Sequence, residues 1–321
     1  MIAFASAMQL ELDPINKALR DITEEMPAHL RDIASHTLTA GGKRLRPLLT
    51  LFSARLFGAS GDELYSLAAI PEMIHAATLL HDDVLDNAAT RRGQPAAHTV
   101  FGAPQSILAG DALLSMANYK AASYGNPDIM RCVSESVLMT AEGEVHEMHL
   151  QHKTAFGQKE YVSVIAGKTG WLLRCACRLG ALYAGAPQEA VEAISTYGLN
   201  LGIAFQIVDD ALDFADEAVT GKPSGGDLME GKCTPPVMLY LDFLPIFDRE
   251  NFRNRFRSGR LTEEDRLRIS ADIRRLGFDE KTREMAGEYL DAAGKALDTL
   301  ADARRLDFFR DALAFVQARK K

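Results

Sequence analysis

Cysteine is scarce in this chain, and the few cysteines lack the spacing of a metal site. The 321 residues contain four, Cys132, Cys175, Cys177 and Cys233, with no CxxC pair among them. A disulfide framework and a cysteine-based zinc site are therefore not expected. Cys175 and Cys177 flank a single alanine, and we interpret them as small buried thiols. The simplest interpretation is a cytoplasmic protein with reduced thiols.

An excess of basic charge is also missing. The formal net charge is -8 at pH 7 and the pI is about 5.6. Because nucleic-acid backbones are bound by basic surfaces, nucleic acid is not expected as a partner. Any site for phosphate groups has to be a local concentration of positive charge.

Long hydrophobic runs are absent as well. The first residues include no basic segment, and Glu11 and Asp13 interrupt their apolar stretch, so we expect neither a signal peptide nor an anchor. No run of about 18 apolar residues occurs elsewhere, which argues against a transmembrane span. Peripheral contact with a membrane stays open.

The residues that are plentiful favour helices. Ala, Leu, Glu, Arg and Met dominate between twelve thinly spread prolines, and apolar residues recur at helical spacing, as at Ile203 and Ile207. We predict an all-α fold in a single domain over residues 1–321. Glycine and proline predict breaks between helices in five segments. These segments are 41–42, 93–95, 125–127, 185–187 and 221–236.

Two carboxylate clusters share the same internal spacing. Asp82 and Asp86 lie at i and i+4, one helical turn apart, with Asp83 beside them. A second cluster, Asp209, Asp210 and Asp213, repeats this arrangement. Like charges at this spacing destabilise a helix unless a cation neutralises them, and oxygen ligands suit magnesium. A solvated acidic face is the alternative, but the apolar flanks of both clusters favour a magnesium site.

Read with their surroundings, these clusters resemble the trans-polyprenyl diphosphate synthase family over nearly the whole chain. The order and spacing of seven segments carry the resemblance. They are Gly41-Gly42-Lys43-Arg44-Leu45-Arg46-Pro47, His75 through the first cluster to Arg91-Arg92-Gly93, Gly110-Asp111, Glu142-Gly143-Glu144, Lys168-Thr169, Phe205-Gln206 before the second cluster, and Gly221-Lys222-Pro223 through Asp227 to Gly231-Lys232.

The resemblance implies an architecture and an activity. Family members are bundles of long helices around a deep central cavity, normally homodimers, with the two aspartate motifs facing each other across the cavity mouth. They join isopentenyl diphosphate to an allylic diphosphate, head to tail, and release diphosphate. Membrane contact would then serve product release.

The same resemblance assigns roles to individual residues. The metal ligands would be Asp82, Asp83, Asp86, Asp209, Asp210 and Asp213, and Mg²⁺ would be the cofactor. The catalytic group would be Asp82, Asp83, Asp86, Lys168, Asp209 and Asp210. The allylic diphosphate would be bound by Arg91, Lys168, Thr169, Gln206, Lys222 and Lys232. Isopentenyl diphosphate would be bound by Lys43, Arg46, His75 and Arg92.

Product length in this family depends on the floor of the cavity below the first cluster. Ile74, Ala77 and Thr78 share a helical face with the metal ligands. Short-chain members carry aromatic residues near the last two of these positions. Because both side chains are small here, we predict a long-chain product, with the floor set deeper, around Met116 or Tyr119. A short-chain, farnesyl or geranylgeranyl, product is the alternative.

Four positions stand out, three of them departures from the family pattern. Gly170 stands where alanine is usual, Asn118 where an aromatic residue is common, and Pro236 follows Pro235. Pro71 is expected to start or kink the helix before the first cluster.

Three further classes of protein remain as alternatives. His81-Asp82 is also typical of HD-type phosphohydrolases, but that site leaves the second cluster and the lysines unexplained. A non-catalytic subunit of a heteromeric synthase would be expected to have lost its aspartates. A terpene cyclase would not need Lys43, Arg46 and Arg92.

Overall fold

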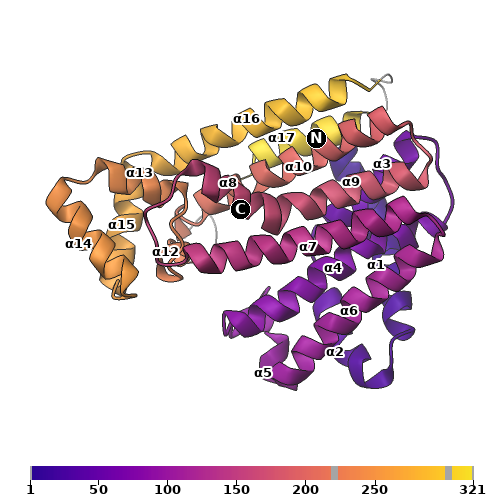
Figure 1. The fold of residues 1–321 in the computed structure, drawn as a ribbon, viewed down its shortest axis with the longest axis horizontal. Helices are drawn as coiled ribbons and strands as arrows, with labels where there is room; N and C mark the ends of the chain where they lie inside the picture. The colour runs from indigo at the N-terminus through magenta and orange to yellow at the C-terminus, as the bar shows by residue number, and fades with distance from the viewer. Residues whose placement is uncertain (1, 218–222, 301–305, 320–321) are drawn as a thin grey trace. The chain divides into compact units, whose positions relative to one another are not determined.

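The computed structural model describes residues 2–217, 223–300 and 306–319, and these residues are mostly helical (Figure 1). The all-α prediction is confirmed. The elements are α1 (Ile2–Glu24), α2 (Ala28–Leu38), α3 (Leu45–Leu56), α4 (Glu63–Leu85), β1 (Thr90–Arg91), β2 (Gln94–Pro95), α5 (Ala97–Phe101), α6 (Ala103–Ser123), α7 (Pro127–Leu150), α8 (Gln158–Ile165), the π-helix η1 (Ala166–Gly170), α9 (Trp171–Tyr183), α10 (Gln188–Leu212), α12 (Gly226–Met229), α13 (Pro235–Phe243), α14 (Ile246–Arg257), α15 (Glu263–Arg275), α16 (Phe278–Asp298) and α17 (Asp307–Gln317).

The predicted breaks are confirmed at four of the five segments, where turns or loops separate neighbouring elements. The fifth is described only from residue 223 onwards, and there it contains the short α12 and the start of α13. Pro235 and Pro236 occupy the first turn of α13, where a missing N–H breaks no helical hydrogen bond. Pro71 does not start its helix, because α4 begins at Glu63.

The chain folds as two compact units. The first comprises Met1–Leu138, Leu172–Gly198 and Leu297–Asp311, and the second comprises Met139–Trp171, Leu199–Ala296 and Ala312–Lys321. Each unit therefore collects segments that are distant in the sequence.

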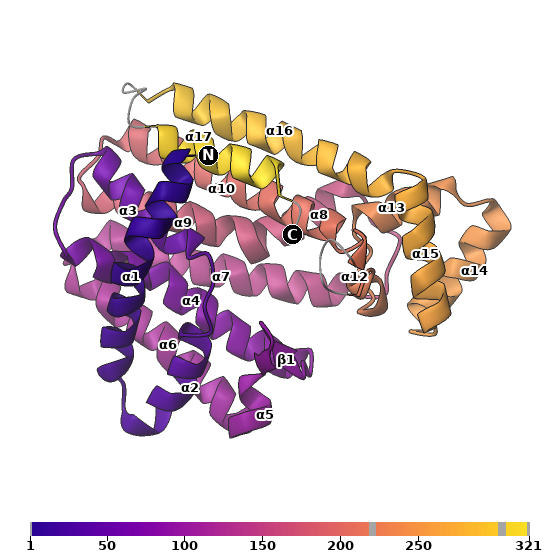
Figure 2. The ribbon, with the colours of Figure 1, turned by 180° about the vertical axis from the view of Figure 1, so that it is seen from behind.

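In the first unit, α4 and α6 lie side by side (Figures 1 and 2). Buried apolar residues follow each other every four positions along α6, at Ala109, Leu113 and Ala117. This spacing gives α6 one face that packs closely on a neighbour. A Cβ on Gly110 would lie only 2.3 Å from Nε2 of His81 on α4, so any larger residue here would require the His81 ring to move.

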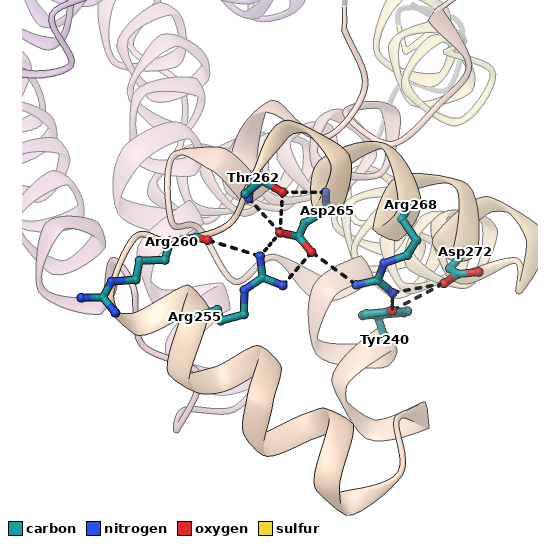
Figure 3. A network of polar contacts seen from close by, with 7 residues as sticks. All are labelled: Tyr240, Arg255, Arg260, Thr262, Asp265, Arg268 and Asp272. Carbon is teal, nitrogen blue, oxygen red and sulfur yellow. Dashed lines mark hydrogen bonds and ion pairs between the residues drawn. The ribbon is translucent and has the colours of Figure 1, made fainter.

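In the second unit, aromatic and aliphatic side chains join α13, α14 and α15 into a compact cluster that includes Phe214, Tyr240, Phe256 and Ile269. A polar network crosses the same three helices (Figure 3). At its centre, Asp265 accepts hydrogen bonds from the backbone N–H and the hydroxyl of Thr262, at 2.9 and 2.8 Å. Arg255 of α14 pairs with the same carboxylate.

One helix within the described ranges, α10, is long and apolar enough by length and composition to cross a membrane. In its most apolar window, 61% of the residues are buried inside the structure. Core helices of soluble proteins meet the same criterion, so α10 is weak evidence for a span. The absence of a membrane span stays a prediction.

Candidate active site

Both carboxylate clusters lie at the C-terminal end of a helix. Asp82 and Asp83 are in the last turn of α4 and Asp86 caps it, while Asp209 and Asp210 are in the last turn of α10. The partial negative charge of the helix dipole at this end adds to the repulsion between the carboxylates. Such an end favours a cation, which supports the interpretation of the clusters as metal sites.

The three aspartates of the first cluster differ in environment. Asp83 is only 3% exposed, and its carboxylate accepts a hydrogen bond of 2.5 Å from Nε of Arg91. Asp82 is half-buried and Asp86 is exposed. Asp83 and Arg91 therefore already neutralise each other, whereas Asp82 and Asp86 are the members whose carboxylates reach solvent.

The second cluster divides in a similar way. Asp209 is exposed and forms an ion pair of 2.7 Å with Arg319. Asp210 is buried, and it accepts hydrogen bonds from the Tyr161 hydroxyl at 2.6 Å and from the Gln206 amide at 2.8 Å. Asp213 accepts the backbone N–H groups of residues 226 and 227, at 3.2 and 3.1 Å, where α12 begins. Asp209 is the member that is open to a ligand from solvent.

Burial changes the acidity of this second cluster. It raises the pKa of Asp210 to about 7, although the hydrogen bonds from Tyr161 and Gln206 act in the opposite direction. Burial likewise raises the pKa of Asp213 to about 6, against the effect of the two backbone N–H groups. Asp227 is also buried beside them, and its pKa is raised well above its usual value by burial and by its acidic neighbours.

The donor set fits magnesium only in part. In the part of the chain that the structure describes, no three His, Cys, Asp or Glu side chains converge closely enough to hold a metal ion. Magnesium, however, commonly binds one or two carboxylates and completes its shell with water and phosphate oxygens. Asp82 with Asp86, and Asp209, match such incomplete ligand sets, which a diphosphate would complete.

The first unit also contains a group of cations. Burial lowers the pKa of Arg46, Glu72 counteracts this, and Arg92 lowers it further. The pKa of His75 is well below its usual value because of burial and the positive charges of Arg46, Arg92 and Arg91. His75 is therefore neutral at pH 7. Like charges that depress each other's pKa form an unbalanced positive site, which suits an anion.

Lys43 and Arg92, the other two residues predicted to bind isopentenyl diphosphate, both lie near Gly42. Lys43 is exposed, next to Gly42, whose added Cβ would lie 3.0 Å from a guanidinium nitrogen of Arg92. Arg92 has a positive φ of 52° and, with Gly93, forms the tight turn of the β1–β2 hairpin. The sequence did not predict this hairpin, although Arg-Gly between two short extended segments is its signal. The hairpin presents Arg91 and Arg92 together.

The lysines of the second unit already have carboxylate partners. Lys168, in the π-helix η1, lies 2.6 Å from Glu147 and 3.0 Å from Glu144. Lys232 lies 2.7 Å from Glu230 and 3.9 Å from Glu147. Burial lowers the pKa of both lysines, but their carboxylate partners outweigh it, so both pKa values are raised and both lysines are charged.

Close helix packing explains the local geometry around Lys168. A Cβ on Gly143 of α7 would lie 2.6 Å from the backbone nitrogen of Lys168. A Cβ on Gly202 of α10 would lie 2.6 Å from the Cα of Gly170, so the glycine at 202 permits this contact, whereas a Cβ on Gly170 would meet Leu199 at 3.0 Å. Single π-helical turns are frequent at functional sites.

A hydrogen-bonded chain links the predicted substrate-binding residues to the second cluster. The Thr169 hydroxyl donates to the Gln206 amide oxygen at 2.8 Å, and Gln206 donates in turn to Asp210. A cavity of about 90 Å³ adjoins this chain. It is lined by Glu147, Leu150, Gln151, Phe156, Tyr161, Val164, Ile165, Lys168, Gln206, Asp210, Asp227, Lys232, Cys233 and Thr234. Lys222 lies outside the described residues.

Sequence reasoning assigned no role to Glu147, Asp227 or Tyr161, although all three line this cavity. Glu147 follows Glu144 by three residues, which places both on one face of α7, and this spacing was the available signal. The contact of Tyr161 with Asp210 joins residues far apart in the sequence. No local pattern indicates it.

The residues predicted to set product length lie on α4. Ile74 and Ala77 are fully buried in the first unit, and Thr78 is half-buried, with its hydroxyl donating to the carbonyl of His75. Met116 is half-buried on α6, but Tyr119 is 68% exposed. The position of the cavity floor, at Met116 or Tyr119, therefore stays a prediction, and the exposure of Tyr119 favours Met116.

An all-α fold with aspartates at helix ends and lysines around a cavity is typical of an enzyme that acts on phosphate esters. The chain belongs to the family described as polyprenyl synthetase, whose model matches residues 27–266. It is a prenyltransferase of the trans-prenyl diphosphate synthase type, which confirms the predicted family. The phosphohydrolase and terpene cyclase alternatives are thereby excluded.

Particular relatives span nearly the whole chain. A short chain isoprenyl diphosphate synthase from Methanothermobacter thermautotrophicus is 33% identical over 94% of this chain and 92% of its own length. A decaprenyl diphosphate synthase from Rhodobacter capsulatus has a TM-score of 0.91 and 35% identity, covering 99% of this chain and 98% of the other. A polyprenyl synthase from Caulobacter crescentus, complexed with calcium and isoprenyl diphosphate, has a TM-score of 0.92 and 34% identity, with the same coverage.

Proposed function

We propose that this chain condenses isopentenyl diphosphate with an allylic diphosphate to give a long-chain polyprenyl diphosphate, as one catalytic domain acting in the cytoplasm. The observation that supports substrate binding best is the presence of two separate cationic groups. One consists of Arg46 and Arg92, beside the neutral His75, in the first unit, and the other of Lys168 and Lys232 in the second. Two diphosphate substrates require two such groups.

The reaction breaks the bond between the allylic carbon and the diphosphate oxygen, and diphosphate leaves with the electron pair. The double bond of isopentenyl diphosphate then forms the new carbon–carbon bond, and loss of a proton to the departing diphosphate restores an alkene. Mg²⁺ held by Asp82, Asp86 and Asp209 would stabilise the negative charge on the leaving diphosphate. Lys168 and Lys232 would bind the same diphosphate by charge.

The residues of the isopentenyl group act by position rather than by proton transfer. Arg46 and Arg92 supply two fixed positive charges, and the neutral His75 supplies one hydrogen-bond donor between them. A diphosphate at this place would relieve the mutual repulsion of the arginines. Lys43, exposed at the end of the same segment, would add a further charge from solvent.

The direct test uses purified protein, magnesium, farnesyl diphosphate and labelled isopentenyl diphosphate, with chromatography of the dephosphorylated products. A long-chain product is expected. A geranylgeranyl product would instead support the short-chain alternative, which the similarity to a short chain synthase favours. Release of free phosphate without chain growth would contradict the proposal.

The length of the product is tested on α4. Ala77→Tyr should shorten the product if this face lines the path of the growing chain. Because Ala77 is fully buried, the half-buried Thr78→Phe serves as a second variant that disturbs packing less. An unchanged product distribution in a folded, active variant would contradict the assignment of Ile74, Ala77 and Thr78 to chain length.

A further inference from the structure

One carboxylate group in the second unit forms ion pairs with both lysines that are proposed to bind substrate. The Oε2 atom of Glu147 lies 2.6 Å from Nζ of Lys168 and 3.9 Å from Nζ of Lys232. Glu144 and Glu230, by contrast, each form an ion pair with only one of the two lysines. Glu147 is therefore placed where an anion that bridges both lysines would bind.

The environment strengthens this contact. The side chains of Lys168, Glu147 and Lys232 are 26%, 23% and 23% exposed, so water screens their charges less than at an open surface. Among the carboxylates that raise the pKa of either lysine against the effect of burial, Glu147 contributes most. Glu147 therefore favours the charged form of both lysines, together with Glu144 at Lys168 and with Asp227 and Glu230 at Lys232.

The local charge balance is unfavourable to an incoming anion. The two lysines form ion pairs with three carboxylates, those of Glu147, Glu144 and Glu230. An arriving diphosphate would meet lysines whose charge is already compensated. An anion that bridges both lysines competes with Glu147 for the same N–H donors.

We propose that Glu147 is a competing counter-ion of the diphosphate site: it bridges Lys168 and Lys232 when no substrate is bound, and the diphosphate replaces it. When the product diphosphate leaves, Glu147 returns to the lysines. This exchange lowers the free energy needed to release diphosphate, a strongly charged product, from the two lysines. The proposal deepens the proposed function, on which it rests for the identity of the anion.

The test compares the binding of inorganic pyrophosphate to wild type and to Glu147→Gln by titration calorimetry, without metal and with Mg²⁺. Glutamine keeps the shape of the side chain and removes its charge. Without metal, we expect the variant to bind pyrophosphate roughly fivefold more tightly. This is the size expected when a partly buried ion pair no longer competes with the ligand. With Mg²⁺, whose charge offsets that of the carboxylate, the gain should shrink.

Two control variants separate this role from a general effect of charge or of packing. Glu230→Gln removes a carboxylate that contacts Lys232 alone and is 54% exposed, so its effect should stay below about twofold. Glu147→Asp keeps the charge and should bind pyrophosphate like wild type. Thermal unfolding with and without pyrophosphate shows whether each variant is folded, and Glu147→Gln should gain the larger upward shift in Tm.

Unchanged or weaker binding of pyrophosphate by folded Glu147→Gln would overturn the proposal, as would an equal gain in Glu230→Gln. The calorimetry requires no prenyl product. If the chain formed no product but Glu147→Gln bound pyrophosphate more tightly, the counter-ion role would stand and the proposed function would fall. If the chain formed product but Glu147→Gln bound pyrophosphate as wild type does, the proposed function would stand and the counter-ion role would fall.

Discussion

Arg44 shows how neighbouring basic residues of one motif acquire different roles. Lys43 is exposed, but the next side chain is buried and forms an ion pair of 2.7 Å with Glu72, with exposed fractions of 3% and 6%. Arg44 also donates to Asn16 at 2.9 Å and has a positive φ of 49°. The sequence pattern placed all the basic residues of this motif together, and only the fold separates the structural arginine from the substrate-binding ones.

Glu72→Gln should therefore destabilise the protein strongly. The substitution leaves a buried guanidinium without a counter-charge, and breaking a buried pair in this way costs about 3–5 kcal/mol. Urea unfolding measures the loss. In the double variant Arg44→Met/Glu72→Leu no charge is left unpaired, so it should recover much of the stability. A loss below about 1 kcal/mol in Glu72→Gln would contradict the importance of the pair.

His75 carries a prediction about pH. Its pKa in the folded protein is lowered well below the usual value by burial and by Arg46, Arg92 and Arg91. As pH falls through about 6.5, the unfolded chain therefore gains a proton at this residue that the folded protein does not bind. Stability should fall from pH 7 to pH 5 for this reason.

The variant His75→Gln, which does not titrate, isolates that contribution. The Tm of wild type should decrease more between pH 7 and pH 5 than the Tm of the variant does. The KM for isopentenyl diphosphate should rise in the variant, with a smaller change in kcat, because His75 is proposed to bind substrate. Parallel decreases in Tm for both proteins would show that the imidazole does not have the low pKa.

At the scale of helices, element boundaries were easier to predict from local sequence than contacts between elements. Breaks at glycine and proline were predicted because these residues limit the backbone locally, and the structure confirms them at residues 41–42, 93–95, 125–127 and 185–187. The pairing of Tyr161 with Asp210 depends on how α8 and α10 pack, which no local pattern encodes. The two aspartate clusters looked equivalent for the same reason, although burial makes their members different.

The start of α15 carries the prediction at this scale. Thr262 and Asp265 form a reciprocal capping box, in which Asp265 also binds Arg255 (Figure 3). Burial alone would raise the pKa of Asp265, but these hydrogen bonds outweigh it and lower the pKa to about 2. The ionised carboxylate therefore stabilises the folded protein above pH 4, and this contribution is lost as pH falls from about 4 to about 2.

Asp265→Asn should lower the free energy of unfolding at pH 7 by about 1–2 kcal/mol, as expected for a lost cap and ion pair. The difference from wild type should shrink as pH falls below 4, because wild type then loses the same charge. Urea midpoints at pH 7 and pH 3 provide the measurement. Thr262→Ser keeps the capping hydroxyl and should stay within about 0.5 kcal/mol of wild type. A difference independent of pH would argue against a role for the charge.

For the whole molecule, the apolar side chains left exposed indicate how chains associate. Leu108 and Tyr119 of α6 are 60% and 68% exposed, and they are eleven residues apart, which places them on one face about three helical turns from each other. Leu138 of α7, in the same unit, is 67% exposed. If these side chains form part of one contiguous apolar patch, the patch is a candidate protein interface.

We therefore expect a homodimer that uses the exposed face of α6, with an interface of at least about 1,200 Å². Leu108→Arg should shift the protein towards monomer in sedimentation velocity at micromolar concentration, because it places a charge within the apolar contact. Leu267→Arg is the matched control: Leu267 is 53% exposed but belongs to α15 and not to the face of α6, so the variant should remain a dimer. If wild type is monomeric and becomes active only with a second protein, the chain is instead a subunit of a heteromeric synthase. If both variants dissociate equally, the interface does not lie on α6.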